Sequence, residues 1–181
     1  MSKLTLILAA AVAVVLGGLT LRSFADNSPM PQVGQIAPNF TLPSQEGTPV
    51  TLDTYHGKWV VLYFYPKDMT TGCTIEAHNF QRDLAKYQAV NAVILGVSVD
   101  MVDSHKQFCT KDSLTFTLLS DSDKKVVSEY GSLGSYGPMK IANRNTFLID
   151  PKGKIVKVWT KVNPDVHSEE VLAALSGFEK Q

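Results

Sequence analysis

The hydrophobic and polar positions along the chain indicate buried strands that alternate with helices of one apolar face. Residues 59–65 form a continuous apolar and aromatic run, a pattern typical of a strand buried on both faces. Apolar side chains then recur at helical spacing, and these are Ala77, Phe80, Leu84 and Tyr87. They predict a helix over about 72–88 that lays this face on a sheet. Residues 92–99 are expected to form a second buried strand.

Shorter segments complete the predicted order of elements. The pattern predicts an opening hairpin of strands 40–42 and 50–52, a helix over 102–111, a strand over 116–119, a helix over 124–130, a hairpin of strands 144–150 and 154–160, and a terminal helix from about Ser168. Asp100 or Asp103 is the expected N-cap of the helix over 102–111, and Gly131 is expected to end the helix over 124–130. These elements predict an α/β fold with a central mixed sheet flanked by helices and a β-hairpin near the N-terminus.

The first residues have the pattern of an export signal. Lys3 precedes eighteen uncharged residues, and small Ser23 and Ala25 follow them. This arrangement is that of a secretory signal peptide cleaved after Ala25. The alternative is an uncleaved membrane anchor, because eighteen residues lie near the lower limit for crossing a bilayer.

The predicted organisation is therefore a signal peptide over 1–25, a flexible lead-in over 26–35 and one domain over 36–181. We expect the domain to be exported to the bacterial periplasm, with a tether to the inner membrane only if the leader is kept. A length of 181 residues suits a single domain, and 44% apolar against 19% charged residues exclude a disordered chain. Seventeen basic and seventeen acidic residues cancel, so nucleic acid is not an expected partner. Without Lys3 and Arg22 the net charge is about −2.

Cysteine is the candidate for chemistry. Cys73 and Cys109 are too few for a disulfide scaffold, and neither belongs to a C-x-x-C pair. Cys73 would lie in the first turn of the helix after strand 59–65, where unpaired backbone N–H groups and the helix dipole favour an anion. Thiols at such positions can have pKa values lowered from about 8.5 to between about 3.5 and 7.5. The sequence therefore predicts a half-buried thiolate at Cys73.

Two neighbours are expected to shape the pocket around this sulfur. Thr70 stands three residues earlier, so in a tight turn its hydroxyl can reach the sulfur or the molecule that the sulfur attacks. Pro66 fixes φ at the end of the strand and removes a backbone donor from one side of the pocket. Taken alone, Cys73 could instead be a small packing residue or half of a structural disulfide.

The residues around Cys73 resemble a known family. Pro66-x-x-x-Thr70-x-x-Cys73 at the end of an apolar strand resembles the active-site motif of the peroxiredoxins. The string Phe64-Tyr65-Pro66-Lys67-Asp68, with Gly72-Cys73-Thr74-x-Glu76-Ala77, is similar to the bacterioferritin comigratory protein, or peroxiredoxin Q, subfamily. Further similarity lies in Ala37-Pro38-x-Phe40-x-Leu42, Leu118-Leu119-Ser120-Asp121 and Arg144-x-Thr146-Phe147-Leu148-Ile149-Asp150-Pro151-x-Gly153-Lys154-Ile155. The resemblance covers nearly all of the chain after the leader.

The resemblance implies a thioredoxin-like fold and a thiol-dependent peroxidase that reduces hydrogen peroxide and organic hydroperoxides. It implies the following roles: Cys73 as nucleophile, Thr70 as hydroxyl donor to the peroxide, Arg144 as the cation beside the thiolate, Pro66 as a shield, and Glu76 as the residue that holds Arg144. Attack on one peroxide oxygen requires donors for the charge that develops on the departing oxygen. Taken alone, an arginine at a strand start such as Arg144 is more often a solvated surface residue. Glu76 is equally explained as a carboxylate near a helix N-terminus.

The product of the attack is a sulfenic acid, which a second thiol must resolve. Many members of the subfamily carry this thiol five residues after the nucleophile, where this chain has His78. The resemblance implies Cys109, thirty-six residues after Cys73, as the resolving cysteine and an intramolecular disulfide as the product. The alternative is that Cys109 is a core residue beside Phe108 and that an external thiol resolves the sulfenic acid.

The resemblance also implies thioredoxin or a thioredoxin-like protein as reductant, a monomer, and no bound cofactor. A zinc site is an alternative because the chain holds Cys73, His78, His105 and Cys109. Only the last two stand one helical turn apart, and a metal would quench the thiolate, so we expect no metal. His56 and His167 are expected at loop or cap positions. A thiol–disulfide oxidoreductase, disfavoured by the lack of C-x-x-C, and a binding domain held by one disulfide are the alternative functions.

Overall fold

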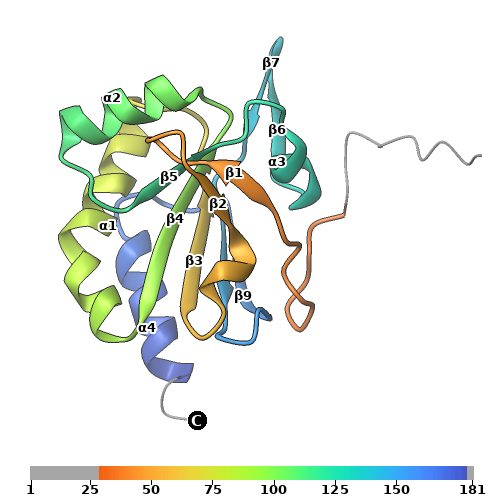
Figure 1. Cartoon of the computed structure of the whole chain (residues 1–181), viewed down its shortest axis with the longest axis vertical. Helices are drawn as coiled ribbons and strands as arrows, with labels where there is room; N and C mark the ends of the chain where they lie inside the picture. The colour runs from red at the N-terminus through yellow and green to blue at the C-terminus, as the bar shows by residue number, and fades with distance from the viewer. Residues whose placement is uncertain (1–28, 179–181) are drawn as a thin grey trace, which may run out of the picture.

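The computed structural model describes residues 29–178, which form one mixed sheet with layers on both faces (Figure 1). The predicted signal peptide over 1–25 and the start of the lead-in lie outside these described residues. Within 29–178, every helix is too short or too polar to cross a membrane.

Five strands form the central sheet, in the order β5-β4-β3-β8-β9. Their bounds are β3 Trp59–Phe64, β4 Ala92–Ser98, β5 Thr117–Ser120, β8 Asn145–Ile149 and β9 Ile155–Thr160. β3, β4 and β5 are parallel, whereas β8 is antiparallel to β3 and β9 is antiparallel to β8. This arrangement confirms the predicted mixed sheet, with the strand at 59–65 in its centre.

Helices and a hairpin cover the two faces of the sheet (Figure 1). One face packs against α1 (Thr71–Ala89), α2 (Val102–Asp112) and α4 (His167–Phe178). The other face packs against the hairpin of β1 (Thr41–Pro43) and β2 (Pro49–Thr51), a short 3-10 helix (Leu52–Tyr55) and α3 (Lys125–Glu129). The sheet therefore separates two apolar cores.

Alternate residues of β3 enter the two cores. Val60, Leu62 and Phe64 join the core on the hairpin side, and Val61 and Tyr63 join the core under α1. All five side chains are buried, and each such burial stabilises the fold by about 1.5–3 kcal/mol relative to an exposed side chain. A strand buried on both faces needs no polar side chain, which is why the sequence there is continuously apolar.

Gly96 in β4 makes room for an aromatic ring of the neighbouring strand. Tyr63 is its partner in register, and a Cβ at position 96 would lie 2.7 Å from the Tyr63 ring and hydroxyl and 2.7 Å from Leu118. Only glycine allows the ring to lie across the strand here. This ring then stacks on Tyr65, directly before the loop that leads to Cys73, at a centroid distance of 5.4 Å.

The structure also corrects some details of the sequence prediction. The hairpin of β6 (Leu133–Tyr136) and β7 (Met139–Ala142) was not predicted, since its strands are short and mostly solvent-exposed. Met101, and neither Asp100 nor Asp103, is the N-cap of α2, because Asp100 turns its carboxylate to Asp68 N and Ser98 Oγ. Gly131 does follow α3, with a φ of 59°.

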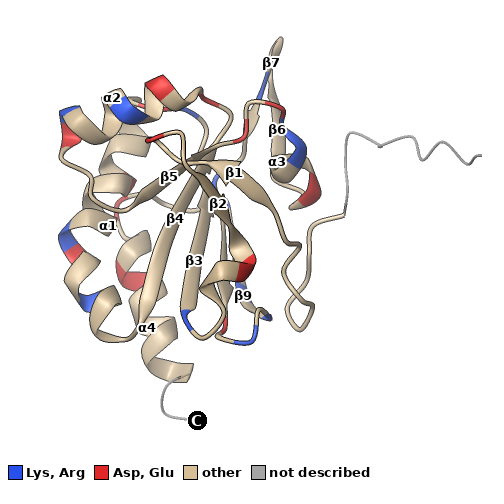
Figure 2. Ribbon diagram, in the orientation of Figure 1, with Lys and Arg blue, Asp and Glu red and all other residues tan. Residues whose placement is uncertain are grey.

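Charged residues of both signs alternate along α1, α2 and α3 in the view of Figure 2, without a face of one sign. This distribution fits the zero formal net charge of the chain.

Candidate active site

The candidate site lies where β3 ends and α1 begins. The intervening loop, residues 65–70, contains a half-buried Pro66 and an exposed Met69 with a φ of 57°. A left-handed backbone is unfavourable for a residue with a side chain. The loop is therefore held in a conformation that its own sequence does not favour, and contacts elsewhere must maintain it.

Cys73 lies in the first turn of α1, as predicted. The helix begins at Thr71, and its N-terminal N–H groups and dipole favour a negative charge on the sulfur. Cys73 is only 2% exposed, so it is buried more deeply than the half-buried thiolate that we expected. The extra burial arises because Cys73 joins the apolar core between α1 and the sheet.

Arg144 reaches Cys73 from the neighbouring strand. Its Nη2 donates a hydrogen bond to Cys73 Sγ at 3.3 Å. Asn145, the first residue of β8, pairs with Phe64, the last residue of β3. Antiparallel pairing thus places Arg144 at the strand end where α1 begins, although 71 residues separate it from Cys73. The cation is positioned by the register of the sheet.

Glu76 holds the other side of the same guanidinium. Arg144 Nη1 donates to Glu76 Oε2, and the second oxygen of this buried carboxyl has no partner in the described residues. Burial raises the pKa of Glu76 to about 7, although Arg144 acts to lower it. Burial also acts to lower the pKa of Arg144, but the charges of Glu76 and Cys73 outweigh it and raise that pKa. Arg144 is therefore a permanent cation shared between two acidic groups.

Thr70 is the N-cap residue of α1, but its side chain does not cap the helix. Its Oγ1 donates to the carbonyl oxygen of Lys67 at 2.9 Å, within the loop. No hydrogen bond joins this hydroxyl to Cys73 among the described residues. The side chain is exposed next to the loop, so the expected contact of Thr70 with a peroxide remains a prediction.

Cys109 lies on α2 and packs against the same apolar core as Cys73. Both cysteines are free thiols; Cys73 is buried and Cys109 is half-buried. Burial raises the pKa of Cys109 to about 11, and the negative charges of Asp68 and Glu46 add to this effect. Cys109 therefore has an environment that keeps it protonated.

The two histidines of the zinc alternative bind carboxylates instead. His78 Nε2 lies 3.0 Å from Asp112 Oδ1, and His105 Nδ1 lies 2.8 Å from Asp68 Oδ2. Within residues 29–178, no group of three or more His, Cys, Asp or Glu side chains has the arrangement of a metal site.

The sequence analysis did not predict the contact between Asp68 and His105. His105 is fully buried and Asp68 is 4% exposed. The resemblance covers Asp68 within the Pro66-Lys67-Asp68 string, but nothing in the sequence indicates which partner, 37 residues away, it contacts. His167 is likewise buried, and its Nε2 lies 2.8 Å from Thr146 Oγ1, so it is more than the cap that we expected.

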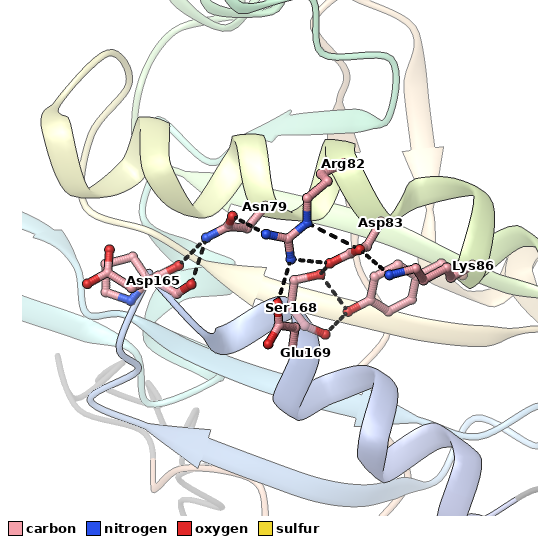
Figure 3. A network of polar contacts seen from close by, with 9 residues as sticks. Asn79, Arg82, Asp83, Lys86, Asp165, Ser168 and Glu169 are labelled. Atoms are coloured by element: carbon pink, nitrogen blue, oxygen red, sulfur yellow. Dashed lines mark hydrogen bonds and ion pairs between the residues drawn. The ribbon is translucent and has the colours of Figure 1, made fainter.

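A second polar network, drawn in Figure 3, joins α1 to the start of α4. Its centre is the buried carboxylate of Asp83, which accepts hydrogen bonds from Arg82, Lys86 and Ser168. These donors hold the pKa of Asp83 well below its usual range, with Arg82 the largest cause. The network fixes α4 on α1, and it includes none of the predicted site residues.

Comparison with known proteins identifies similar chains over the whole described domain. The model of the AhpC/TSA family matches residues 33–158. Peroxiredoxin Bcp of Bacillus subtilis is 38% identical over 154 residues, which cover 83% of this chain and 98% of the relative. Peroxiredoxin Bcp of Xanthomonas campestris is 42% identical over 139 residues, which cover 75% of this chain and 87% of the relative.

Solved structures show the same similarity. Peroxiredoxin Q of Xylella fastidiosa, as a cysteine-to-serine mutant, matches with a TM-score of 0.79 and 37% identity over 84% of this chain and 99% of its own. The bacterioferritin comigratory protein of Xanthomonas campestris, studied for its alkyl peroxide reduction activity, matches with a TM-score of 0.73 and 37% identity over 77% of this chain and 91% of its own. These neighbours confirm the predicted thioredoxin-like fold.

Proposed function

Because the chain belongs to the AhpC/TSA family, and within it to the Bcp or peroxiredoxin Q peroxiredoxins, it is a thiol-dependent peroxidase, and we propose that Cys73 is its peroxidatic residue. The observation that carries this proposal is the contact between Arg144 Nη2 and Cys73 Sγ at 3.3 Å. A buried sulfur beside a permanent cation and a helix N-terminus has the surroundings that a reactive thiolate requires.

The first step that we propose is attack by the Cys73 thiolate on one oxygen of the peroxide. The sulfur–oxygen bond forms as the oxygen–oxygen bond breaks, which yields a sulfenic acid and, after uptake of a proton, water or an alcohol. Arg144 and the N–H groups at the start of α1 stabilise the negative charge as it moves from sulfur to the departing oxygen. Sulfur is oxidised by two electrons and the peroxide is reduced by two.

Thr70 and Pro66 are proposed to bind and shield the substrate. The Thr70 hydroxyl now donates to Lys67 O, and a peroxide could take that hydrogen bond or donate to the oxygen of the same hydroxyl. Pro66 has no backbone N–H, so it offers no competing donor at the end of β3.

The second step that we propose joins Cys73 to Cys109. The Cys109 sulfur attacks the sulfenic sulfur, a disulfide forms, and hydroxide leaves and becomes water. Both cysteines lie in one apolar core, but they are free thiols in the described state. A disulfide requires Cα atoms within about 7 Å and suitably directed Cβ atoms. We propose that the start of α1 or the helix of Cys109 opens locally during turnover to bring the two sulfurs together.

The third step returns the disulfide to two thiols. We propose thioredoxin or a thioredoxin-like protein as the dithiol donor, and hydrogen peroxide and organic hydroperoxides as substrates. The alkyl peroxide reduction described for the Xanthomonas campestris neighbour supports the inclusion of organic hydroperoxides. We further propose export to the periplasm and a monomeric state, which the mass and elution volume of the protein purified from a periplasmic fraction would test.

Peroxide consumption with thioredoxin as reductant tests the assignment of the two cysteines. Cys73→Ser is expected to abolish consumption. Cys109→Ser is expected to react once with peroxide at the wild-type rate, but to lose recycling by thioredoxin and accumulate sulfenic and sulfinic acid. Full activity of Cys73→Ser would exclude Cys73 as the nucleophile. Full thioredoxin-dependent turnover of Cys109→Ser would exclude Cys109 as the resolving residue.

A further inference from the structure

A buried polar contact ties the active-site loop to the helix of Cys109. The carboxylate of Asp68, in the loop before Cys73, accepts hydrogen bonds from Tyr65 Oη at 2.6 Å and from Ser104 Oγ at 2.7 Å. His105 Nδ1 lies 2.8 Å from the same carboxylate. Ser104 and His105 belong to the first turn of α2. One carboxylate thus connects the end of β3, the loop and α2.

This contact is buried and shielded from water. The side chains of His105 and Asp68 are 0% and 1% exposed. Burial acts to raise the pKa of Asp68, but the hydrogen bonds and charge of His105, with Tyr65 and Ser104, outweigh it and lower that pKa. Because Asp68 is ionised, His105 Nδ1 carries a hydrogen and donates it. His105 Nε2 is buried without a partner in the described residues, so this histidine is fixed by Asp68 and Tyr65 alone.

The contact has no direct part in the attack on peroxide. Asp68 and His105 contact each other, the Asp68 carboxylate accepts from Tyr65 and Ser104, and Asp68 N–H donates to the Asp100 carboxylate. Arg144 instead contacts Cys73 and Glu76. Cys109, by contrast, stands one helical turn after His105. The Asp68 contact thus restrains the first turn of α2, four residues before Cys109.

A second histidine–aspartate pair lies at the other end of α2. His78 of α1 contacts Asp112, the last residue of α2. This pair is different because the His78 side chain is 52% exposed, so it contributes at most about 1 kcal/mol. The buried pair at the first turn is therefore the stronger of these two histidine–aspartate contacts of α2.

From these contacts we infer that Asp68 and His105 are positioning residues that control access of Cys109 to the Cys73 sulfenic acid. We call the Asp68–His105–Ser104 contact the latch. The latch must open before Cys109 reaches the sulfenic acid. The inference rests on the proposed function, since it requires Cys109 to be the resolving residue. Met69, next to Asp68, has a left-handed backbone, which is unfavourable for a residue with a side chain. Opening the latch allows this conformation to relax.

The latch then sets a competition between two fates of the sulfenic acid. While it is closed, a second peroxide can oxidise the Cys73 sulfenate to a sulfinic acid, with loss of water or an alcohol. When it opens, Cys109 forms the disulfide and water is released. A weaker latch should therefore speed disulfide formation and protect Cys73 from sulfinic acid.

The test compares two buried aspartates in the full protein. Asp68→Asn replaces an acceptor with an amide that cannot accept from all three donors. Asp83→Asn is the matched control, because Asp83 is also a buried carboxylate with three donors but ties α1 to α4 instead (Figure 3). Each variant receives one equivalent of hydrogen peroxide for the disulfide step and a titration with excess hydrogen peroxide for the sulfinic acid. Both products are followed by quenched-flow alkylation and mass spectrometry.

Asp68→Asn should form the disulfide about tenfold faster than the wild type, because a tenfold change in rate corresponds to the loss of one charged hydrogen bond. The variant should also need a higher peroxide concentration to reach the same fraction of sulfinic acid. Its rate of sulfenic acid formation should stay within about twofold, and Asp83→Asn should match the wild type in both steps. An unchanged or slower disulfide step in Asp68→Asn, or the same acceleration in Asp83→Asn, overturns the latch.

A second pair of variants separates the latch from the effect of the Asp68 charge on Cys109. His105→Leu keeps that charge but removes the donor, and should also accelerate disulfide formation. His105→Asn keeps a donor near the position of Nδ1, and should return the rate toward that of the wild type. Acceleration in Asp68→Asn alone would assign the effect to charge and overturn the latch. If the wild type forms no disulfide between Cys73 and Cys109, the proposed resolving step is wrong. If the wild type forms this disulfide but all variants form it at the same rate, only the latch is wrong.

Discussion

The charged groups near the two cysteines have opposite signs, although both sulfurs belong to one apolar core. Cys73 has the cation Arg144 at 3.3 Å and a helix N-terminus beside it. Cys109 has neither, and burial with the negative charges of Asp68 and Glu46 raises its pKa to about 11. The surroundings thus separate the proposed nucleophile, Cys73, from Cys109, whose environment keeps it protonated. Burial alone does not distinguish them; the placement of one arginine does.

The largest test of this difference removes the cation. Arg144→Met keeps most of the apolar stem but loses the charge and both hydrogen bonds. We expect the rate constant for Cys73 oxidation by hydrogen peroxide, measured by stopped-flow fluorescence, to fall by about 10²–10³-fold. The alkylation rate of Cys109 should not change. Arg144→Lys should recover only part of the loss, because an ammonium cannot hold Glu76 and Cys73 in one fork. A near wild-type rate in Arg144→Met would remove the distinction between the two thiols.

The protonation of Cys109 can be measured in Cys73→Ser. Because burial raises the pKa of Cys109 from 9.0 to about 11, its alkylation by iodoacetamide in the folded protein should rise about tenfold per pH unit between pH 7 and pH 10. In urea the rate should level off near pH 9. The folded state binds this proton more tightly than the unfolded state. The associated stability is therefore complete below pH 9 and is lost as the pH rises from about 9 to about 11. A folded-state plateau at or below pH 9 would contradict this environment.

Glu76→Gln should have a smaller effect on rate and a distinctive effect on stability. Gln can still accept a hydrogen bond from Arg144, so we expect a loss of less than about tenfold in peroxide reactivity. Folding raises the pKa of Glu76 from 4.5 to about 7. The wild type should consequently lose stability, on the order of 3 kcal/mol, as the pH rises from about 4.5 through about 7. The Gln variant should lack this component. Parallel unfolding curves for both proteins across that pH range would show that the buried carboxyl is not destabilised by its charge.

Thr70→Val should have the smallest effect. Val keeps the shape of the side chain and removes the hydroxyl that donates to Lys67 O. One neutral hydrogen bond corresponds to about 1 kcal/mol, so the rate with hydrogen peroxide should fall about fivefold. Thr70→Ser should stay within about twofold. A rate in Thr70→Val equal to the wild type would limit this residue to loop structure.

Local patterns predicted most of the fold but only part of the site. The apolar run at 59–65 and the spacing of Ala77, Phe80 and Tyr87 were sufficient for β3 and α1, because both depend on burial alone. The position of Cys73 in the first turn followed from them. The N-cap of α2 was predicted wrongly because Asp100 binds Asp68 N–H, a contact between distant segments.

The polar contacts across the fold could not be predicted in the same way. The Asp68–His105 pair joins residues 37 positions apart, and the Arg144–Cys73 pair joins residues 71 positions apart. No periodicity encodes such partners. Family resemblance supplied Arg144 and Glu76, whereas the buried role of His105 emerged only once α2 was placed against the loop. The export signal at 1–25 lies outside the described residues and remains a prediction.

The pairing of Phe64 with Asn145 limits how this catalytic unit can be transplanted. A contiguous graft of residues 65–73 onto another scaffold would carry the loop, the helix start and the sulfur, but would leave the guanidinium behind. Deletion of one residue within β8 would be equally harmful, since a single-step slip turns the side chains of the strand to the opposite face. Designed and natural variants must therefore keep the alignment of β3 and β8. Insertions should be tolerated far better in the β6–β7 hairpin than at the start of β8.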